Sequence, residues 1–313
     1  MPPRPRDDGL SEVVGFVLLL GVIVIALSLY QVYGVPAVGR ENEIAHMNQV
    51  KDRFVDYKLA LDSLWVNNRN GVLLSTAFDL GTGAPATAGT VFALPILTPA
   101  GSGGMVLVRD DGAKLTITAQ KEGEEGEEEE EEKVIPLGSL SYRSSNNYWV
   151  EQTWTYQMGA VFLSQEGGTA VRVGPSIAVA KTKDENVSLT VAPVRLEGSD
   201  MIAGSGPVRV ETRMRKSDPP ILDVRYTQVN LIIEAGDDVT ARAWKRAFDE
   251  VRQRAIVEDV TSLLVPELLD DNKVRLTINP VADGEPAEDK YVFLTVYPAN
   301  YTVTIHSAAS LVE

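Results

Sequence analysis

A long run of uncharged, apolar residues near the start is the first pattern in the chain. Residues 13–30 read VVGFVLLLGVIVIALSLY, with Ser28 as the only hydroxyl besides the final tyrosine. As a helix this run extends about 27 Å, close to the roughly 30 Å thickness of a bilayer's hydrocarbon core. Tyr30 and Tyr33 fall where interfacial aromatic side chains are expected. The pattern predicts a transmembrane helix over residues 10–33, anchored by Val13, Phe16, Leu20, Ile25 and Leu29.

The next segment, residues 34–69, turns polar but keeps a helical period. Gly34 and Pro36 predict a kink or a short break before it. Beyond them, apolar side chains recur at three- and four-residue spacing, which predicts an amphipathic stalk helix ending near Asn67–Asn68. This helix either packs one face on the following domain or also contacts other subunits. Its apolar positions are Ile44, Met47, Val50, Phe54, Leu61 and Leu64 or Trp65.

From residue 70 to 313 the pattern changes to short strands and turns. Apolar and polar side chains alternate with period two in stretches such as 115–118 and 274–278, which is typical of sheets with one buried face. Asp111-Gly112 predicts a hairpin between two short strands. The expected fold class is mainly β, a single antiparallel β-sandwich-like domain preceded by a long N-terminal helix. The expected strands are 72–79, 90–97, 104–109, 114–119, 133–136, 160–164, 170–174, 177–181, 187–194, 208–213, 228–234, 273–280, 291–297 and 301–307.

One helix interrupts the strands over residues 240–255. Thr240 is a candidate N-cap, and an apolar stripe that includes Trp244 and Phe248 lies opposite a charged face. A short helical turn through Val260–Leu264 is expected to follow it, up to Pro266. An aromatic stripe of this kind belongs to a hydrophobic core more often than to a cofactor site. A second aromatic stretch, Tyr148–Tyr156, either packs inside the domain or, if exposed, stacks on sugars or peptides.

Charge narrows the range of partners. The net charge is −15, from 44 acidic and 29 basic residues, and nine of the glutamates lie between Glu122 and Glu132. Such a run repels itself, so residues 121–132 are predicted to form a disordered, protruding loop. Without these nine charges about −6 remains for the rest of the chain. The balance argues against a nucleic-acid partner, which requires clustered Lys and Arg.

The residues that usually carry catalysis are scarce. The chain has no cysteine and two histidines, which excludes disulfides, thiolate zinc sites and cysteine nucleophiles. No nucleophile elbow, phosphate-binding loop, dinucleotide loop or metal-binding histidine pair occurs. The sequence therefore predicts neither an enzyme nor a cofactor. Two sequons, Asn186-Val187-Ser188 and Asn300-Tyr301-Thr302, make Asn186 and Asn300 candidate glycosylation sites.

The residues before the apolar run resemble a known N-terminus. A short charged leader ends at Gly9, and Leu10-Ser11-Glu12-Val13-Val14-Gly15 follows. This arrangement resembles archaeal type IV pilin-like proteins, which carry a class III signal peptide. The resemblance implies that a prepilin peptidase-type protease cuts between Gly9 and Leu10 and leaves the helix in place. It also implies a cytoplasmic leader and an extracellular C-terminal domain. Asp8 stands where the family usually has a basic residue.

Two functions follow from these expectations. The first is a single-pass protein of the cell membrane, a pilin-like or minor pilin-like subunit with a structural role in a type IV pilus-like assembly. Its N-terminal helix would then contact further copies or other pilin-like subunits. The alternative is an envelope binding protein that stays tethered to the membrane and does not polymerise. An ordinary cleaved signal peptide is less favoured, because its apolar region spans only 7–15 residues and a small-x-small cleavage site follows it.

Overall fold

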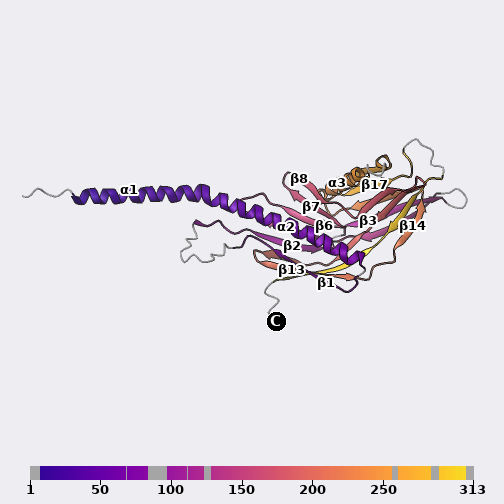
Figure 1. Cartoon of the computed structure of the whole chain (residues 1–313), viewed down its shortest axis with the longest axis horizontal. Helices are drawn as coiled ribbons and strands as arrows, with labels where there is room; N and C mark the ends of the chain where they lie inside the picture. Colours follow the sequence, from indigo (N-terminus) through magenta and orange to yellow (C-terminus); the bar gives the residue numbers. More distant parts are fainter. Residues whose placement is uncertain are drawn as a thin grey trace, which may run out of the picture.

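The structure is a computed structural model that describes residues 8–67, 69–83, 97–110, 112–122, 128–255, 260–282 and 289–307, with side chains from residue 13 onward except that of Glu128. A long helix projects from one end of a β domain (Figure 1). The predicted fold class is confirmed, since the chain is mainly β with one long apolar helix at its N-terminus. The leader residues 1–7 and most of the strand predicted over 90–97 lie outside the described residues.

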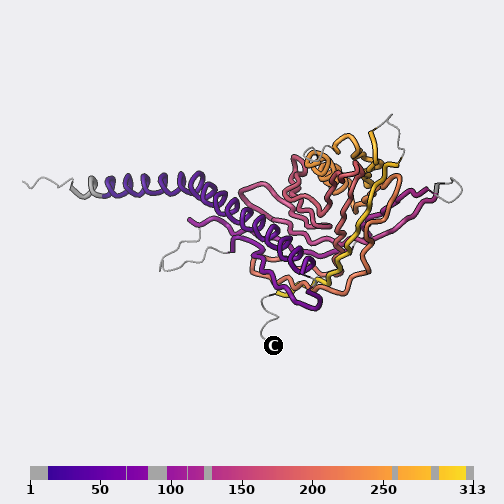
Figure 2. Tube along the Cα trace, turned by 45° about the vertical axis from the view of Figure 1, so that its right-hand side comes forward, coloured from indigo at the N-terminus to yellow at the C-terminus, as the bar shows by residue number. Residues whose placement is uncertain are grey.

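The N-terminal helix bends without breaking. It consists of α1 (Asp8–Leu29), a π-helical turn η1 (Tyr30–Gly34) and α2 (Val35–Val66). The backbone N–H of Val35 donates to the carbonyl oxygen of Tyr30, which is the wide spacing of a π-turn. Pro36 has no N–H to donate and so removes a bond from the first turn of α2. The predicted kink is therefore present, and the helix changes direction there in both views (Figures 1 and 2).

The strands of the described residues form four sheets. The first has the order β1 (Leu73–Asp79), β13 (Pro207–Arg215), β19 (Ala299–Ser307), β11 (Val194–Glu197). The second has the order β14 (Ile221–Tyr226), β18 (Val292–Val296), β10 (Val187–Val191), β9 (Ile177–Lys181). The third has the order β12 (Met201–Gly204), β2 (Gly103–Arg109), β5 (Ser139–Ser145), β6 (Thr153–Gln157), β7 (Ala160–Gln165), β8 (Gly168–Val173). The fourth has the order β16 (Leu264–Asp270), β17 (Lys273–Ile278), β15 (Gln228–Glu234), β3 (Lys114–Glu122), β4 (Glu128–Pro136).

Several strands continue from one sheet into the next. The sheets are antiparallel except that β10 runs parallel to β18 and β11 runs parallel to β19. This parallel ladder crosses from the second sheet into the first, because the N–H of Tyr297 donates to Val191 (2.9 Å) and that of Ala299 to Pro193 (2.9 Å). On the other side of the domain, β2 leads into β3 and β4 leads into β5. The four sheets therefore follow one another in a ring.

Two hydrophobic cores lie inside this ring. The stalk core holds one face of α2 between the first and third sheets, with Phe54, Trp154 and Tyr301 among its side chains. The second core, which we call the distal core, lies between the second and fourth sheets. It is covered by α3 (Asp238–Arg254), which contributes Trp244 and Phe248. The stripe predicted for this helix is therefore core, and the indole N–H of Trp244 donates to the Gln157 side chain (2.7 Å).

A close approach of the two sides separates the cores. Gly138 lies between β4 and β5, and a Cβ atom built on it would overlap the carbonyl oxygen of Leu196 in β11. Only glycine permits backbones to come this near to each other. The two sides of the domain therefore touch where Gly138 meets Leu196, a place that we call the waist. Both cores share the strands that pass through it.

The acidic run corrects one prediction. Residues 128–132, predicted as part of a disordered loop, instead open strand β4 and pair with β3, while residues 123–127 lie outside the described residues. In a strand successive side chains point to opposite faces, so neighbouring glutamates are separated. Glu129 lies opposite Lys121, and Glu131 accepts a hydrogen bond from the Tyr226 hydroxyl (2.7 Å). Backbone pairing and these partners offset the repulsion that the prediction was based on.

Local pairing corrects three further predictions. The strands on either side of Asp111-Gly112 do not form a hairpin with each other, because β2 pairs with β5 and β3 pairs with β4. Helix α3 is capped by Asp237, whose carboxylate accepts from the N–H of Thr240 (2.7 Å), so Thr240 is not the N-cap. The turn after it is a short 3-10 helix, Thr261–Leu263, but Pro266 lies within strand β16. The sequence did not predict β5, β6, β12, β14 or β16, and the strand predicted over 187–194 reaches only the first residue of β11.

Candidate functional site

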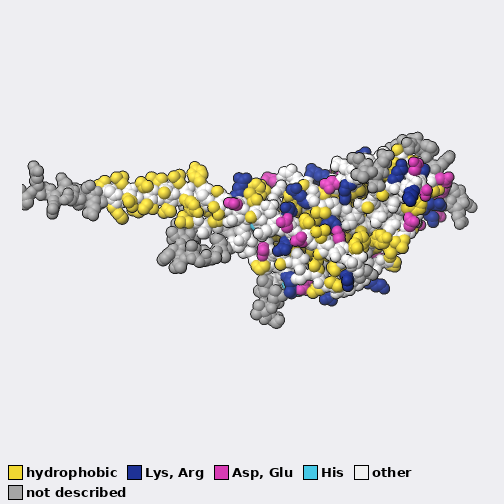
Figure 3. Space-filling model, viewed as in Figure 1, with side chains coloured by type: hydrophobic (Ala, Val, Ile, Leu, Met, Phe, Trp, Pro, Cys, Tyr) yellow, Lys and Arg dark blue, Asp and Glu magenta, His cyan; other side chains and the backbone are white. Residues whose placement is uncertain are grey.

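The described side chains of α1 are exposed on all sides of the helix. The anchor residues predicted from the sequence, Val13, Phe16, Leu20, Ile25 and Leu29, are all exposed. In the space-filling view α1 is covered with hydrophobic side chains, while charged groups are spread over the β domain (Figure 3). This helix is long and apolar enough to cross a membrane, by length and composition. A soluble protein rarely leaves so much contiguous apolar surface in water.

Burial begins abruptly just after the π-turn. Tyr33 is 71% exposed, whereas Val35, two residues later, is 7% exposed. From there one face of α2 is buried at three- and four-residue intervals. The buried positions are Val35, Gly39, Glu43, His46, Met47, Val50, Phe54, Tyr57, Lys58 and Leu61. The helix is therefore divided into a free segment and a segment held by the β domain, and the boundary lies within one turn.

The buried carboxylate of Glu43 attaches α2 to the β domain near the start of the segment that the domain covers. Glu43 is only 1% exposed. Its two oxygens accept hydrogen bonds from the backbone N–H groups of Asn147 (2.7 Å) and Tyr148 (2.8 Å). Hydrogen bonds to an ionised acceptor are about twice as strong as neutral ones. Glu43 thus ties α2 to the loop between β5 and β6, which we call the β5–β6 loop (residues 146–152).

Two aromatic side chains of the β5–β6 loop complete this attachment. The Tyr148 ring lies on Gly39, where any Cβ atom would collide with it. The Arg40 guanidinium lies over the Trp149 ring, 4.5 Å from the centroid, a cation–π contact. The stretch Tyr148–Tyr156 was predicted either to be buried or to form an exposed aromatic patch. Trp154 and Tyr156 are buried, whereas Trp149 is half-buried beside the helix.

Further along α2, hydroxyl groups satisfy the polar atoms of the stalk core. The hydroxyls of Tyr57 and Thr212 are hydrogen-bonded (2.9 Å), and the Tyr301 hydroxyl donates to the carbonyl oxygen of Leu61 (2.8 Å). Burial raises the pKa of the Tyr57 phenol above its ordinary value, and the bond to Thr212 partly opposes this shift. Burial likewise raises the pKa of Tyr301. These phenols stay neutral and hold the helix in register.

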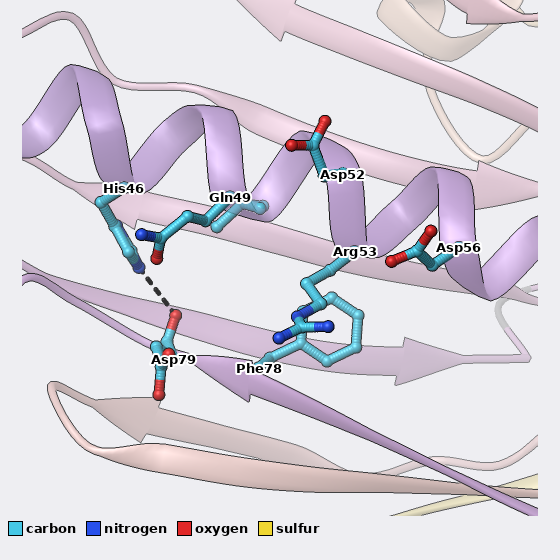
Figure 4. Close-up of a pocket in the computed structure, with 8 residues that line it drawn as sticks. His46, Gln49, Asp52, Arg53, Asp56, Phe78 and Asp79 are labelled. Atoms are coloured by element: carbon cyan, nitrogen blue, oxygen red, sulfur yellow. Dashed lines mark hydrogen bonds between the residues drawn. The ribbon is translucent and has the colours of Figure 1, made fainter.

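A small pocket lies between α2 and β1. It has a volume of about 200 Å³, and His46, Asp52, Arg53, Asp56 and Phe78 are among its lining residues (Figure 4). The Nε2 atom of His46 is 2.9 Å from the carbonyl oxygen of Asp79, so this nitrogen carries the proton. Among the described residues no three His, Asp or Glu side chains are placed to hold a metal ion. The described residues that line this pocket do not form a recognisable catalytic arrangement.

The other predicted sites lie apart from this attachment. The backbone of Gly9 and Leu10 is in the first turns of α1, and their side chains lie outside the described residues. Asn186 and Asn300 are both half-buried. The side-chain oxygen of Asn186 accepts from the N–H of Tyr291 (2.9 Å) where β10 and β18 begin.

Glu43 is a residue of this attachment that the sequence analysis did not single out. The heptad-like pattern of α2 places it among apolar positions, between Gly39 and Met47. An acidic residue on the buried stripe of an amphipathic helix was the available signal. Its partners are backbone groups more than a hundred residues away, which the sequence alone does not indicate.

The fold and the attachment together define a class of protein. It is a β protein carried on a helix that is long and apolar enough to span a membrane. The chain belongs to the family described as a family of unknown function (DUF7289), whose model matches residues 102–281. The matched region starts beside β2 and ends after β17, so it leaves out both segments of the N-terminal helix. No curated protein and no solved structure matches the chain.

Proposed function

We propose that the protein is a single-pass membrane-anchored archaeal surface protein, a pilin-like or minor pilin-like subunit with a structural role. The short leader lies in the cytoplasm and the β domain outside the cell. The observation that supports this function is the exposed apolar surface of α1 directly beside the firmly held α2. Lipid tails, or the equivalent helices of neighbouring subunits, are the surroundings that such a surface requires.

Any assembly between subunits uses α1. The apolar face of α2 is already covered by the β domain of the same chain. Its outward face carries charged side chains such as Glu41, Asp52 and Arg53. Contacts between helices therefore require α1, whose whole circumference is apolar. The same distribution fits the second candidate function, a tethered envelope binding protein, because α2 offers little apolar surface to a second copy.

Membrane anchoring is tested by placing charges within α1. We expect the wild-type chain to remain in the membrane pellet after extraction with alkaline carbonate. Substituting Leu20→Arg together with Ile23→Arg is expected to release a large fraction, because each central arginine opposes insertion by about 2.5–3.5 kcal/mol. Leu59→Arg is the matched control, since Leu59 is an exposed leucine of α2 outside the anchor. Release of the wild-type chain by carbonate would contradict the proposal.

Processing and assembly are tested separately. Mass spectrometry of the native protein is expected to give an N-terminus at Leu10, and Gly9→Trp to leave the leader attached. A native N-terminus downstream of Tyr33 would exclude a retained anchor. Electron microscopy of cells carrying a tagged copy then distinguishes the two candidate functions. Labelled filaments favour the pilin-like subunit, and a uniform surface label without filaments favours the tethered binding protein.

A further inference from the structure

The spacing of charges around α1 indicates how close the β domain lies to the membrane. The 27 residues from Val13 to Gly39 carry no charge, and Glu12 and Arg40 flank them. As a helix they extend about 40 Å, which matches the roughly 40–45 Å of a bilayer including its headgroup regions. Arg40 therefore falls at the level of the outer headgroups when α1 spans the membrane.

The β domain reaches this level as well. Burial of the helix starts at Val35, only two residues after the exposed Tyr33. No free stretch of helix separates the domain from the end of the anchor. Among the described groups of the domain that meet the helix near this level are Tyr148, on Gly39, and Trp149, under Arg40.

The β5–β6 loop is rigid where it carries these groups. Besides its two bonds to Glu43, it is held by the side chain of Asn147, which donates to the carbonyl oxygen of Gly101 (3.0 Å). The side chain of Asn146 donates to the carbonyl oxygen of Val150 (2.9 Å) and closes the turn. The side chain of Val150 nevertheless remains 45% exposed. A fixed turn that presents a half-buried Trp and an exposed Val beside an Arg fits an interface between water and lipid.

We propose that Trp149, Val150 and Arg40 form a second contact with the bilayer, which seats the β domain on the headgroup region of the membrane that α1 crosses. Arg40 binds lipid phosphate, while Trp149 and Val150 enter the boundary between headgroups and acyl chains. This contact rests on the proposed membrane anchoring. It fixes the orientation of the domain, because a helix and a separate loop together define a plane.

Site-directed spin labelling tests the depth of the loop. The chain has no cysteine, so Val150→Cys gives a single labelling site in the full-length protein, reconstituted in phosphatidylcholine–phosphatidylglycerol vesicles. Leu268→Cys is the control, because Leu268 has similar exposure (43%) on β16 at the distal core. We expect the ratio of oxygen to nickel-chelate accessibility to be several-fold higher at position 150 than at 268. Equal ratios at both positions would overturn the inference.

Fluorescence gives an independent readout that needs no label. Lipids brominated near the headgroup are expected to quench part of the tryptophan emission, and Trp149→Phe to remove the quenched part. Trp65→Phe is the control, because Trp65 lies at the far end of α2. Quenching that is unchanged by Trp149→Phe would contradict the second contact. Flotation of the vesicles distinguishes failure of the second contact from failure of the membrane anchor. A protein that floats with the vesicles while Trp149 is unquenched has the anchor but lacks the second contact. A protein that does not float with the vesicles lacks the anchor.

Discussion

Replacing Glu43 by alanine should release the β5–β6 loop from the helix. The carboxylate accepts two backbone hydrogen bonds at 2.7 and 2.8 Å while almost fully buried. Hydrogen bonds to charged groups contribute about 1.5–3 kcal/mol each. The loop borders solvent, so water replaces part of this loss, and about 3 kcal/mol is the expected cost of Glu43→Ala. At 1.4 kcal/mol per factor of ten, the open state of the loop becomes about 100-fold more populated.

Amide hydrogen exchange measures this opening directly. In the full-length protein in lipid nanodiscs, the amides of Asn147 and Tyr148 are expected to exchange about 100-fold faster in Glu43→Ala. Glu43→Gln is expected to give an intermediate increase of about 10-fold, because its carbonyl oxygen still accepts one bond while its NH₂ group faces the second N–H. Glu41→Ala is the matched control, since Glu41 is an exposed acid two residues away.

Amides of α3 in the distal core separate a local effect from global unfolding. They are expected to exchange at the wild-type rate in all of these variants, because α3 packs in a different core. Unchanged exchange of the two loop amides in Glu43→Ala would refute the reasoning. Equal acceleration throughout the domain would also refute it, since Glu43 would then support the whole fold rather than the attachment of the loop.

Three other changes test the stalk core. Phe54→Ala removes a fully buried ring and should lower the free energy of unfolding, measured by denaturant titration, by about 3–5 kcal/mol. Leu59→Ala, on the exposed face of α2, should change this free energy by less than about 1 kcal/mol. Burial raises the pKa of Tyr57 in the folded state, so above pH 10 the native state binds more protons than the unfolded state. The free energy of unfolding should therefore be unaffected by this group below pH 10 and should fall as the pH rises further. The absorbance of phenolate at 295 nm should show the buried phenols ionising only when the protein unfolds. Gly39→Val should displace the Tyr148 ring, detected as faster proteolysis within the β5–β6 loop.

The elements with a strong period were predictable from the sequence. The helix ending at Val66 and strands such as Ile177–Lys181 and Gln228–Glu234 lie where the pattern placed them. In these segments apolar side chains mark one buried face, so the period itself carries the information. Met47, Val50, Phe54 and Leu61 of the predicted stripe are buried because the two sheets of the stalk core enclose α2 on that side, whereas Ile44, Leu64 and Trp65 are half-buried.

Strands with hydroxyl-rich faces were not predictable in the same way. Strand β5 reads SLSYRSS, and Ser139, Ser141 and Ser145 lie on the face opposite Leu140 and Tyr142. Serine has a low preference for strands, and the hydroxyl of Ser141 finds its partner in Thr155 of β6 (3.0 Å). That pairing exists only once the sheet has formed. The same reason explains the glutamates of β4, whose partners come from β3 and β14.

The attachment site depends on contacts between distant residues. Glu43 and Tyr148 are separated by more than a hundred positions, and only the folded β5–β6 loop turns two N–H groups toward one carboxylate. The alternation of strands and the period of helices predict which face is buried. They do not predict which polar group on that face finds a hydrogen-bond partner in another part of the chain. The predicted processing site at Gly9 and Leu10 rests on the N-terminal resemblance alone and stays a prediction.

The arrangement of the strands explains why the anchor can orient the whole β domain and not merely its nearest part. The ladder of β10 and β18 passes into that of β11 and β19 through residues 192–193 and 297–298, with backbone hydrogen bonds on both sides of the crossing. A division at the waist would break this ladder and expose apolar side chains of both cores. The distal core therefore moves with the stalk core, and the stalk core is fixed to α2 by Glu43 and the buried aromatic rings. The direction of the N-terminal helix then sets the direction of every sheet.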